Sequence, residues 1–247
     1  MKAMIFAAGL GTRLRPLTND RPKALVEIGG KTMLERVIMK LAAAGFDDIT
    51  INIHHFGEKI IEFLERNSNF GLNLHISDER DLLLDTGGGI LKARPFLDGD
   101  EPFLVHNADI LTDIDLNAMY NNHVESGAMA TLLVKDRTTS RYFVFDDDYR
   151  LQGWLNKSTG ETRPGGFVLS EGMHELAFGG IHVISPSIFE PLEKHSRGEA
   201  KFSITPFYVD ECPTHLIKGY VQTNDYTWLD VGKPETLRQA EEVVKRM

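Results

Sequence analysis

Residues 3–23 read AMIFAAGLGTRLRPLTNDRPK, and this stretch decides the fold. Its first part, residues 3–8, is a short apolar run bounded by glycine, which is typical of a buried strand in a parallel sheet. Gly9 and Gly11 then allow the backbone to turn sharply and to approach a ligand without a Cβ in the way. We therefore predict a strand that carries a glycine turn to the edge of a sheet.

Four cations follow the glycine turn, although the chain as a whole has a formal net charge of −9. They are Arg13, Arg15, Arg21 and Lys23. Backbone N–H groups beside converging cations make a site for a polyanionic phosphate. A dinucleotide fingerprint needs a third glycine where Leu14 stands, and a P-loop needs a Gly-Lys-Ser/Thr ending that is absent. A plain tight turn stays open as an alternative on the glycines alone.

The run from Gly9 to Thr18, followed by Pro22 and Lys23, closely resembles the signature of the sugar-1-phosphate nucleotidylyltransferases. That signature reads Gly-x-Gly-Thr-Arg-Leu-x-Pro-Leu-Thr, then Pro-Lys. The resemblance implies a Rossmann-like nucleotidyltransferase that joins a nucleoside triphosphate to a sugar 1-phosphate, giving an NDP-sugar and pyrophosphate. A non-catalytic regulatory module on the same fold and transfer to a non-sugar acceptor are the alternatives.

Apolar runs of strand length alternate with segments of helical periodicity along the chain. We predict strands at 49–53, 72–76, 102–106 and 128–134, and helices at 32–44, 58–65, 115–126, 202–209 and 234–245. This alternation predicts an α/β fold with a doubly wound, mostly parallel mixed sheet, in a single domain of residues 1–247. In such sheets ligands bind beyond the carboxyl ends of the strands.

The pattern changes near residue 140, where short strand-like runs are split by turn residues. We predict strands at 142–145, 151–155, 167–169 and 177–184. Together they predict a small antiparallel insert, approximately residues 140–180, that covers the sugar end of the site. The resemblance implies that Lys157 contacts the sugar phosphate and that Gly180 lies against the sugar, although the Glu and Pro that flank the family's lysine are absent here.

Residues 86–89 read TGGG at the start of a predicted helix, with Thr86 as its cap. Because glycines are costly in a helix, they indicate either a flat ligand against the backbone or a flexible loop. The resemblance implies contact with the base and ribose, and the segment is most similar to N-acetylmuramic acid 1-phosphate uridylyltransferases and heptose- or mannose-1-phosphate guanylyltransferases. UTP is therefore favoured, with GTP as the alternative. The implied nucleotide-binding residues are Ala7, Ala8, Gly9, Gly11, Thr12, Arg13, Glu79, Thr86, Gly87 and Gly88.

Asp109 directly follows the predicted strand 102–106, where a carboxylate is well placed to hold Mg²⁺ at the ligand edge. Taken alone it is as readily an ordinary turn residue. The resemblance implies that Asp109 binds the metal and that Asp230, within Trp-Leu-Asp-Val-Gly, supplies the second carboxylate. Only a fold that joins these two distant segments would make one Mg²⁺ site of them.

The implied reaction is an in-line attack of the sugar phosphate on the α-phosphorus of the nucleotide. The second pKa of a phosphate monoester is about 6, so the attacking group is already largely dianionic at neutral pH and needs no general base. Catalysis must then come from alignment and charge neutralisation. The resemblance assigns these catalytic roles to Arg13, Lys23 and Asp109.

Composition limits the partners and the compartment. The acidic balance argues against a nucleic-acid-binding protein. No segment approaches the ~18 apolar residues that a membrane span needs. A single cysteine, Cys212, allows no internal disulfide and indicates a reducing compartment, so we expect a cytoplasmic protein whose partners are its two substrates.

Overall fold

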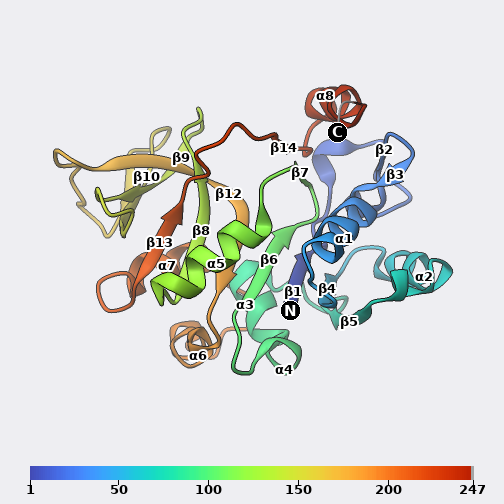
Figure 1. Ribbon diagram of the computed structural model, residues 1–247, viewed down its shortest axis with the longest axis horizontal. Helices are drawn as coiled ribbons and strands as arrows, with labels where there is room; N and C mark the ends of the chain where they lie inside the picture. The colour runs from blue at the N-terminus through green and yellow to red at the C-terminus, as the bar shows by residue number, and fades with distance from the viewer. Residues whose placement is uncertain (246–247) are drawn as a thin grey trace.

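The chain is built around one mixed sheet of ten strands (Figure 1). The computed structural model describes residues 1–245. The parallel part of the sheet has the strand order β6-β1-β4-β5. These strands are β1 (Lys2–Phe6), β4 (Asp48–Ile53), β5 (Asn73–Asp78) and β6 (Phe103–Asn107). The inner strands β1, β4 and β6 are mostly apolar and buried, as parallel strands covered on both faces must be.

Helices cover both faces of this sheet. One face carries α1 (Met33–Ala43), α2 (Gly57–Arg66) and α5 (Leu116–Ser126), and the other carries α3 (Asp85–Lys92), α4 (Arg94–Leu97), α6 (Phe189–Ser196) and α7 (Ile204–Glu211). Neighbouring side chains of β1 divide between two cores, since Ala3 and Ile5 pack with the first set and Met4 with the second. The predicted doubly wound α/β fold is confirmed. Within residues 1–245, no helix is long and apolar enough to cross a membrane.

Antiparallel strands extend the sheet beyond β6. They are β8 (Ala130–Lys135), β9 (Arg141–Phe145), β10 (Leu151–Asn156), β11 (Glu161–Arg163) and β12 (His174–Ile184), and β13 (Ile217–Tyr220) pairs in parallel with β8. The long strand β12 pairs with β6 near its end and with β9 near its start. It also pairs with β8, and its register against β8 shifts between Phe178 and His182. One strand therefore joins the parallel sheet to the antiparallel insert.

The predicted strand at 167–169 is wrong, because the third strand of the insert is β11. Phe167 instead lies on Gly153, where a Cβ would be 3.1 Å from its ring, and it packs with Tyr142. Val168 is 79% exposed. A half-buried aromatic ring in a loop, flanked by exposed apolar residues, thus gave this stretch the apolar pattern of a strand.

Three segments that are far apart in the sequence meet beside the sheet. The strand β7 (Ile110–Thr112) pairs antiparallel with β14 (Trp228–Asp230), so that Asp230 stands opposite Ile110. The helix α8 (Pro234–Val244) lies against the ribbon of β2 (Glu27–Ile28) and β3 (Lys31–Thr32), as Figure 1 shows. A small core shared by the three segments holds them together: Leu14, Val26, Ile28, Met33, Leu111, Val231 and Ala240. Short 3-10 helices lie at Thr12–Leu14, Lys23–Leu25, Ser68–Gly71 and Pro186–Ile188.

Candidate active site

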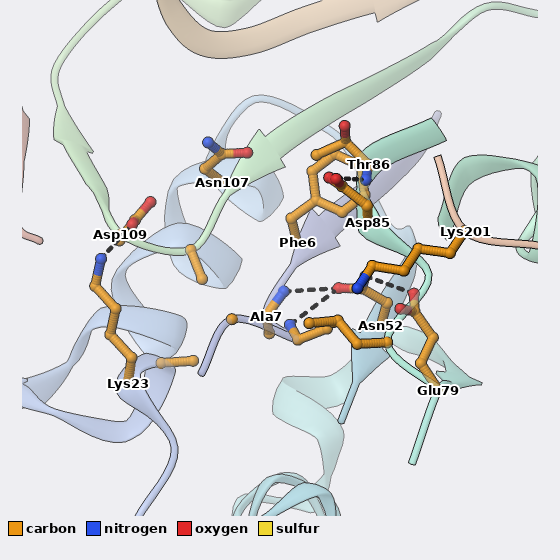
Figure 2. Close-up of a pocket in the computed structure, with 15 residues that line it drawn as sticks. Phe6, Ala7, Lys23, Asn52, Glu79, Asp85, Thr86, Asn107, Asp109 and Lys201 are labelled. Carbon is orange, nitrogen blue, oxygen red and sulfur yellow. Dashed lines mark hydrogen bonds and ion pairs between the residues drawn. The ribbon is translucent and has the colours of Figure 1, made fainter. Parts of the chain in front are cut away.

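A cavity of about 430 Å³ opens where strands β1, β4 and β6 end, the edge at which ligands bind in such sheets. Its wall comes from six separate segments. The lining residues are Phe6, Ala7, Ala8, Gly9, Lys23, Ala24, Asn52, Glu79, Leu83, Asp85, Thr86, Asn107, Ala108, Asp109 and Lys201. Figure 2 shows the ion pair of Lys23 with Asp109 at one end and the hydrogen bonds of Asn52 at the other.

Asn52 fixes the turn that follows β1. Its Oδ1 accepts hydrogen bonds from the amides of Ala7, at 2.7 Å, and Ala8, at 3.3 Å. Its Nδ2 donates to Oε1 of Glu79 at 2.7 Å, and Oε2 of Glu79 accepts from the Leu84 amide at 3.0 Å. Because the amides of Ala7 and Ala8 are already engaged, these two residues can meet a nucleotide only through their remaining atoms.

Glu79 is almost fully buried, with 1% of its surface exposed. Burial raises the pKa of this carboxyl, and the Leu84 amide and the Asn52 side chain act in the opposite direction. Its oxygens are occupied by these two donors, so Glu79 serves as a rigid support for the cavity wall. A direct contact of Glu79 with the nucleotide remains a prediction.

Three side chains that the sequence analysis singled out lie around Gly232, and a fourth, that of Asp109, is paired with one of them. Nζ of Lys23 forms an ion pair with Oδ2 of Asp109. A Cβ at Gly232 would lie 2.7 Å from Oδ1 of Asp230, 3.1 Å from Nη2 of Arg13 and 3.3 Å from Nζ of Lys23. The backbone reinforces the junction, since the Val231 amide donates to the Asp109 carbonyl at 2.8 Å. The structure therefore brings the two predicted carboxylates and the two predicted cations to one place.

The donors at this point suit a magnesium ion. Oδ1 of Asp230 is buried without a hydrogen-bond partner, although a buried carboxylate oxygen ordinarily has one. In residues 1–245, no cluster of three or more His, Cys, Asp or Glu side chains could hold a metal. A pair of carboxylates is nevertheless the typical protein contribution for Mg²⁺, which takes its other ligands from water and substrate phosphates. The residues present therefore fit this ion.

The glycine turn is shaped by its contacts with Lys23 and Thr18. Gly11 has a φ of +63°, and a Cβ there would lie 3.0 Å from Cβ of Lys23. The Thr18 hydroxyl donates to the Gly11 carbonyl at 2.8 Å. Gly9, by contrast, lines the cavity with open space around it. Thr12 begins the short helix that carries Arg13, and neither Gly11 nor Thr12 lines the cavity itself.

Thr86 does not cap the helix in which it lies. The helix α3 begins at Asp85, and the Thr86 hydroxyl accepts a hydrogen bond from the Ile204 amide at 3.0 Å. It thereby satisfies the first turn of α7, an element remote in sequence. The prediction of a local cap is wrong, because the Thr86 hydroxyl accepts its hydrogen bond from the distant Ile204 amide instead of from its own helix.

The glycines after Thr86 make room for protein. A Cβ at Gly87 would lie 2.4 Å from the Phe202 ring, and one at Gly88 would lie 2.1 Å from the Ala200 carbonyl oxygen. Both amides donate to the Phe202 carbonyl, at 2.9 and 3.2 Å. The glycines therefore admit the segment before α7, from which Lys201 projects into the cavity (Figure 2). Contact of Gly87 or Gly88 with a nucleotide stays a prediction.

The two residues predicted to contact the sugar phosphate and the sugar, Lys157 and Gly180, lie in different places relative to the cavity. Lys157 forms an ion pair with Glu175, lies 4.7 Å from the centre of the Tyr142 ring and does not line the cavity, so its placement does not support a contact with the sugar phosphate. Gly180 has a φ of +73°, and a Cβ there would lie 2.8 Å from Nδ2 of Asn107 in the cavity wall. Gly180 therefore stands next to the cavity.

Sequence reasoning missed several lining residues, chiefly Asn52, Asn107 and Lys201. An asparagine within the apolar strand ITINI was a usable signal, because a buried amide needs hydrogen-bond partners. Lys201 carried no signal, since its position depends on the packing of its segment against α3.

The sequence profile of the nucleotidyl transferase family matches residues 2–246. The chain belongs to this family. It is 33% identical over 243 residues to the N-acetylmuramate alpha-1-phosphate uridylyltransferase of Neisseria meningitidis serogroup B, covering 98% of this chain and 97% of that protein. It is 31% identical over 240 residues to the mannose-1-phosphate guanyltransferase of Schizosaccharomyces pombe, covering 95% of this chain and 62% of that protein.

A solved structure supports the fold of this nucleotidyl transferase. HddC from Yersinia pseudotuberculosis, complexed with GMP-PN, superimposes with a TM-score of 0.73 at 24% identity and covers 98% of this chain and 99% of that chain. At this level of identity the likeness concerns the fold. The predicted family of sugar-1-phosphate nucleotidylyltransferases is confirmed by the profile and by the two sequence relatives.

Proposed function

We propose that this nucleotidyl transferase moves a uridylyl group from UTP to a sugar 1-phosphate in a magnesium-dependent reaction. The observation that carries the proposal is a cluster at the edge of the cavity. Arg13, Lys23 and Asp230 lie around Gly232, and Asp109 is ion-paired with Lys23. Two carboxylates next to two cations suit a site that must hold both a metal ion and a polyphosphate.

The chemistry is a single displacement. An oxygen of the sugar phosphate forms a bond to the α-phosphorus of the nucleotide, the bond from that phosphorus to the β-phosphate oxygen breaks, and pyrophosphate leaves with the electron pair. The dianionic phosphate needs no base, since its second pKa is about 6. The protein must therefore align the reactants and neutralise their charge.

Each converging residue has a role in this scheme. Asp109 and Asp230 would hold Mg²⁺, which supplies charge neutralisation at the α-phosphate when bound. Arg13 neutralises the triphosphate. Lys23, which is paired with Asp109 in this structure, binds the α-phosphate or the incoming sugar phosphate. The backbone amides of residues 9–12 cradle the outer phosphates.

UTP is favoured because the relative from Neisseria meningitidis, which matches almost end to end, is named a uridylyltransferase. GTP is the second candidate, because the relative from Schizosaccharomyces pombe is named a guanyltransferase at similar identity. Binding of each nucleoside triphosphate can be ranked by the rise in thermal stability, since a ligand that binds the folded state stabilises it.

The direct test is pyrophosphate release with Mg²⁺, UTP or GTP and a panel of sugar 1-phosphates. Asp109→Ala and Asp230→Ala should each lower turnover by about 10²-fold or more, because each removes charge stabilisation at the reacting phosphate. Asp148→Ala is the matched control, since Asp148 is an exposed turn residue of the insert. Near-normal turnover in either site variant would refute the metal assignment. Absence of release with every pair would favour the regulatory alternative.

A further inference from the structure

A second cavity, of about 460 Å³, lies between the antiparallel insert and the start of α7. Side chains from β9, β10, β11 and β12 form most of its wall. The lining residues are Arg137, Thr139, Arg141, Phe143, Trp154, Glu161, Arg163, Phe178, Ser203, Thr205 and Pro206. None of them was singled out by the family signature.

Positive charge dominates this cavity. Three arginines face one carboxylate, Glu161, and that carboxylate is already engaged by Arg163 at 3.1 and 3.2 Å. Within residues 1–245, the side chain of Arg141 has no hydrogen-bond or ion-pair partner. Arg163 is thus paired and Arg137 interacts electrostatically with Asp230, so Arg141 is the cation of this cavity that is free to bind an anion.

Arg137 is the most constrained of the three. Its Nη2 donates to the Phe178 carbonyl at 3.0 Å, and its guanidinium lies 4.4 Å from the centre of the Trp228 ring. Its Nε is buried without a hydrogen-bond partner. A guanidinium held in place with a free buried donor is prepared to bind an anion, because charge-assisted hydrogen bonds are the strong ones.

Three aromatic side chains lie beside the arginines in this wall. The rings of Phe143 and Phe178 meet edge to face with centroids 6.0 Å apart, and Trp154 lines the same cavity. Apolar rings together with a few placed charged groups are the combination by which small-molecule sites bind and orient a ligand. The C–H faces of a sugar ring suit such a wall, and the arginines suit an anionic substituent on that ring.

This cavity adjoins the proposed reaction centre. Trp228, on which Arg137 lies, belongs to β14, the strand that carries Asp230. Phe178 stands in β12 close to Gly180, whose backbone approaches Asn107 in the first cavity. A molecule with its phosphate near Asp230 could therefore place the far side of its ring in the second cavity.

We infer that the second cavity binds a second anionic group on the sugar, a carboxylate or a phosphate remote from the anomeric carbon, so that the acceptor is an acidic sugar 1-phosphate. This inference rests on the proposed function, because it takes a sugar 1-phosphate as the acceptor. Arg141 and Arg163 would contact the anionic group at the open side, and Arg137 would contact it at the buried side.

The test compares acceptors that differ by one acidic group. The carboxylate pair is N-acetylmuramic acid 1-phosphate against N-acetylglucosamine 1-phosphate, and the phosphate pair is glucose 1,6-bisphosphate against glucose 1-phosphate. With Mg²⁺ and the preferred nucleotide, the acidic member of at least one pair should have the higher kcat/KM, by about 10- to 100-fold, as expected for charge-assisted hydrogen bonds. The pair that shows the preference identifies the group.

Substitutions of the cavity arginines test whether this cavity causes the preference for acidic acceptors. Arg141→Ala, and Arg137→Lys, which keeps the charge but loses the planar fork, should each reduce the ratio of acidic to neutral kcat/KM by about tenfold. Arg150→Ala is the matched control, since Arg150 is exposed on the same insert and does not line the cavity, and it should leave the ratio unchanged. Equal kcat/KM within both pairs, or an equal loss for both members in Arg141→Ala, would overturn the inference while the proposed function stands.

Failure of the proposed function has a separate signature, which is the absence of pyrophosphate release from every acceptor. Calorimetric titration with the same four sugar phosphates then decides the inference by itself. Tighter binding of the acidic member that Arg141→Ala abolishes would support the second cavity as its site. Equal binding within both pairs would refute it.

Discussion

Gly232 offers the sharpest test of the converging site, because a single methyl group can be placed at its centre. In Gly232→Ala the new Cβ would lie 2.7 Å from Oδ1 of Asp230, whereas ordinary contact begins at 3.4 Å. The carboxylate must therefore retreat by about 0.7 Å, and the ends of Arg13 and Lys23 must shift as well. Because these three side chains are the proposed ligands of the metal and phosphates, the methyl group should disturb the reaction geometry directly.

Gly232→Ala should lower kcat/KM strongly and the unfolding free energy only slightly. A misplacement of about 1 Å at a reacting centre can cost about 10²-fold in rate, so kcat/KM for pyrophosphate release should fall by that order, about 2.7 kcal/mol in barrier height. The displaced atoms are the ends of side chains, so the unfolding free energy should fall by only about 1 kcal/mol, near the lower limit for overpacking.

The assay is steady-state pyrophosphate release, paired with urea unfolding of the same preparation. Gly165→Ala is the matched control, since Gly165 has open space where the Cβ would go. Wild-type kcat/KM in Gly232→Ala would refute the reasoning, because it would mean that the convergence of Arg13, Lys23 and Asp230 has no part in the reaction.

Two further predictions concern stability. Asn52→Ala leaves the Ala7 amide and one oxygen of Glu79 buried without partners, at about 1–3 kcal/mol each, so urea unfolding should show a loss of roughly 2–6 kcal/mol. The exposed control Asn19→Ala should change the unfolding free energy by less than about 0.5 kcal/mol. Burial lowers the pKa of His123 to about 4 and that of His182 to about 3. Their folded pKa values lie below the unfolded value of 6.5, so the stability that they contribute is present above pH 6.5 and is lost as the pH falls. At pH 5 the two together should cost about 4 kcal/mol of unfolding free energy, and a flat urea profile between pH 7 and pH 5 would contradict this account.

The fold was largely predictable because it depends on local patterns. The apolar run after Lys2 and the helical spacing of α1 mark buried surfaces, and both elements formed as expected. The doubly wound, mostly parallel sheet followed from the alternation of strands and helices, whereas its strand order was not predicted. The prediction at residues 167–169 failed because Phe167 is a loop residue whose ring packs, half-buried, against the insert, and no periodicity reveals this.

The same distinction between local pattern and distant contact separates the predicted from the unpredicted residues of the candidate site. Arg13, Lys23 and Asp109 lie in or beside recognisable motifs, and the structure brings them together with Asp230. The hydrogen bond of the Thr86 hydroxyl could not be predicted from the residues around it, because its donor, the Ile204 amide, is distant in sequence. The position of Lys201 in the cavity wall could not be predicted for a related reason. It depends on the packing of Ala200 and Phe202 against Gly87 and Gly88.

The antiparallel pairing of β7 with β14 has a consequence for the order in which the protein matures during translation. Asp109 leaves the ribosome before Asp230, so a nascent chain can contain every lining residue of the cavity while the second carboxylate of the proposed metal site is still missing. In the proposed scheme, activity therefore requires that β14 and α8 emerge and dock against the segment of Leu14, Val26 and Ile28, which is synthesised earlier.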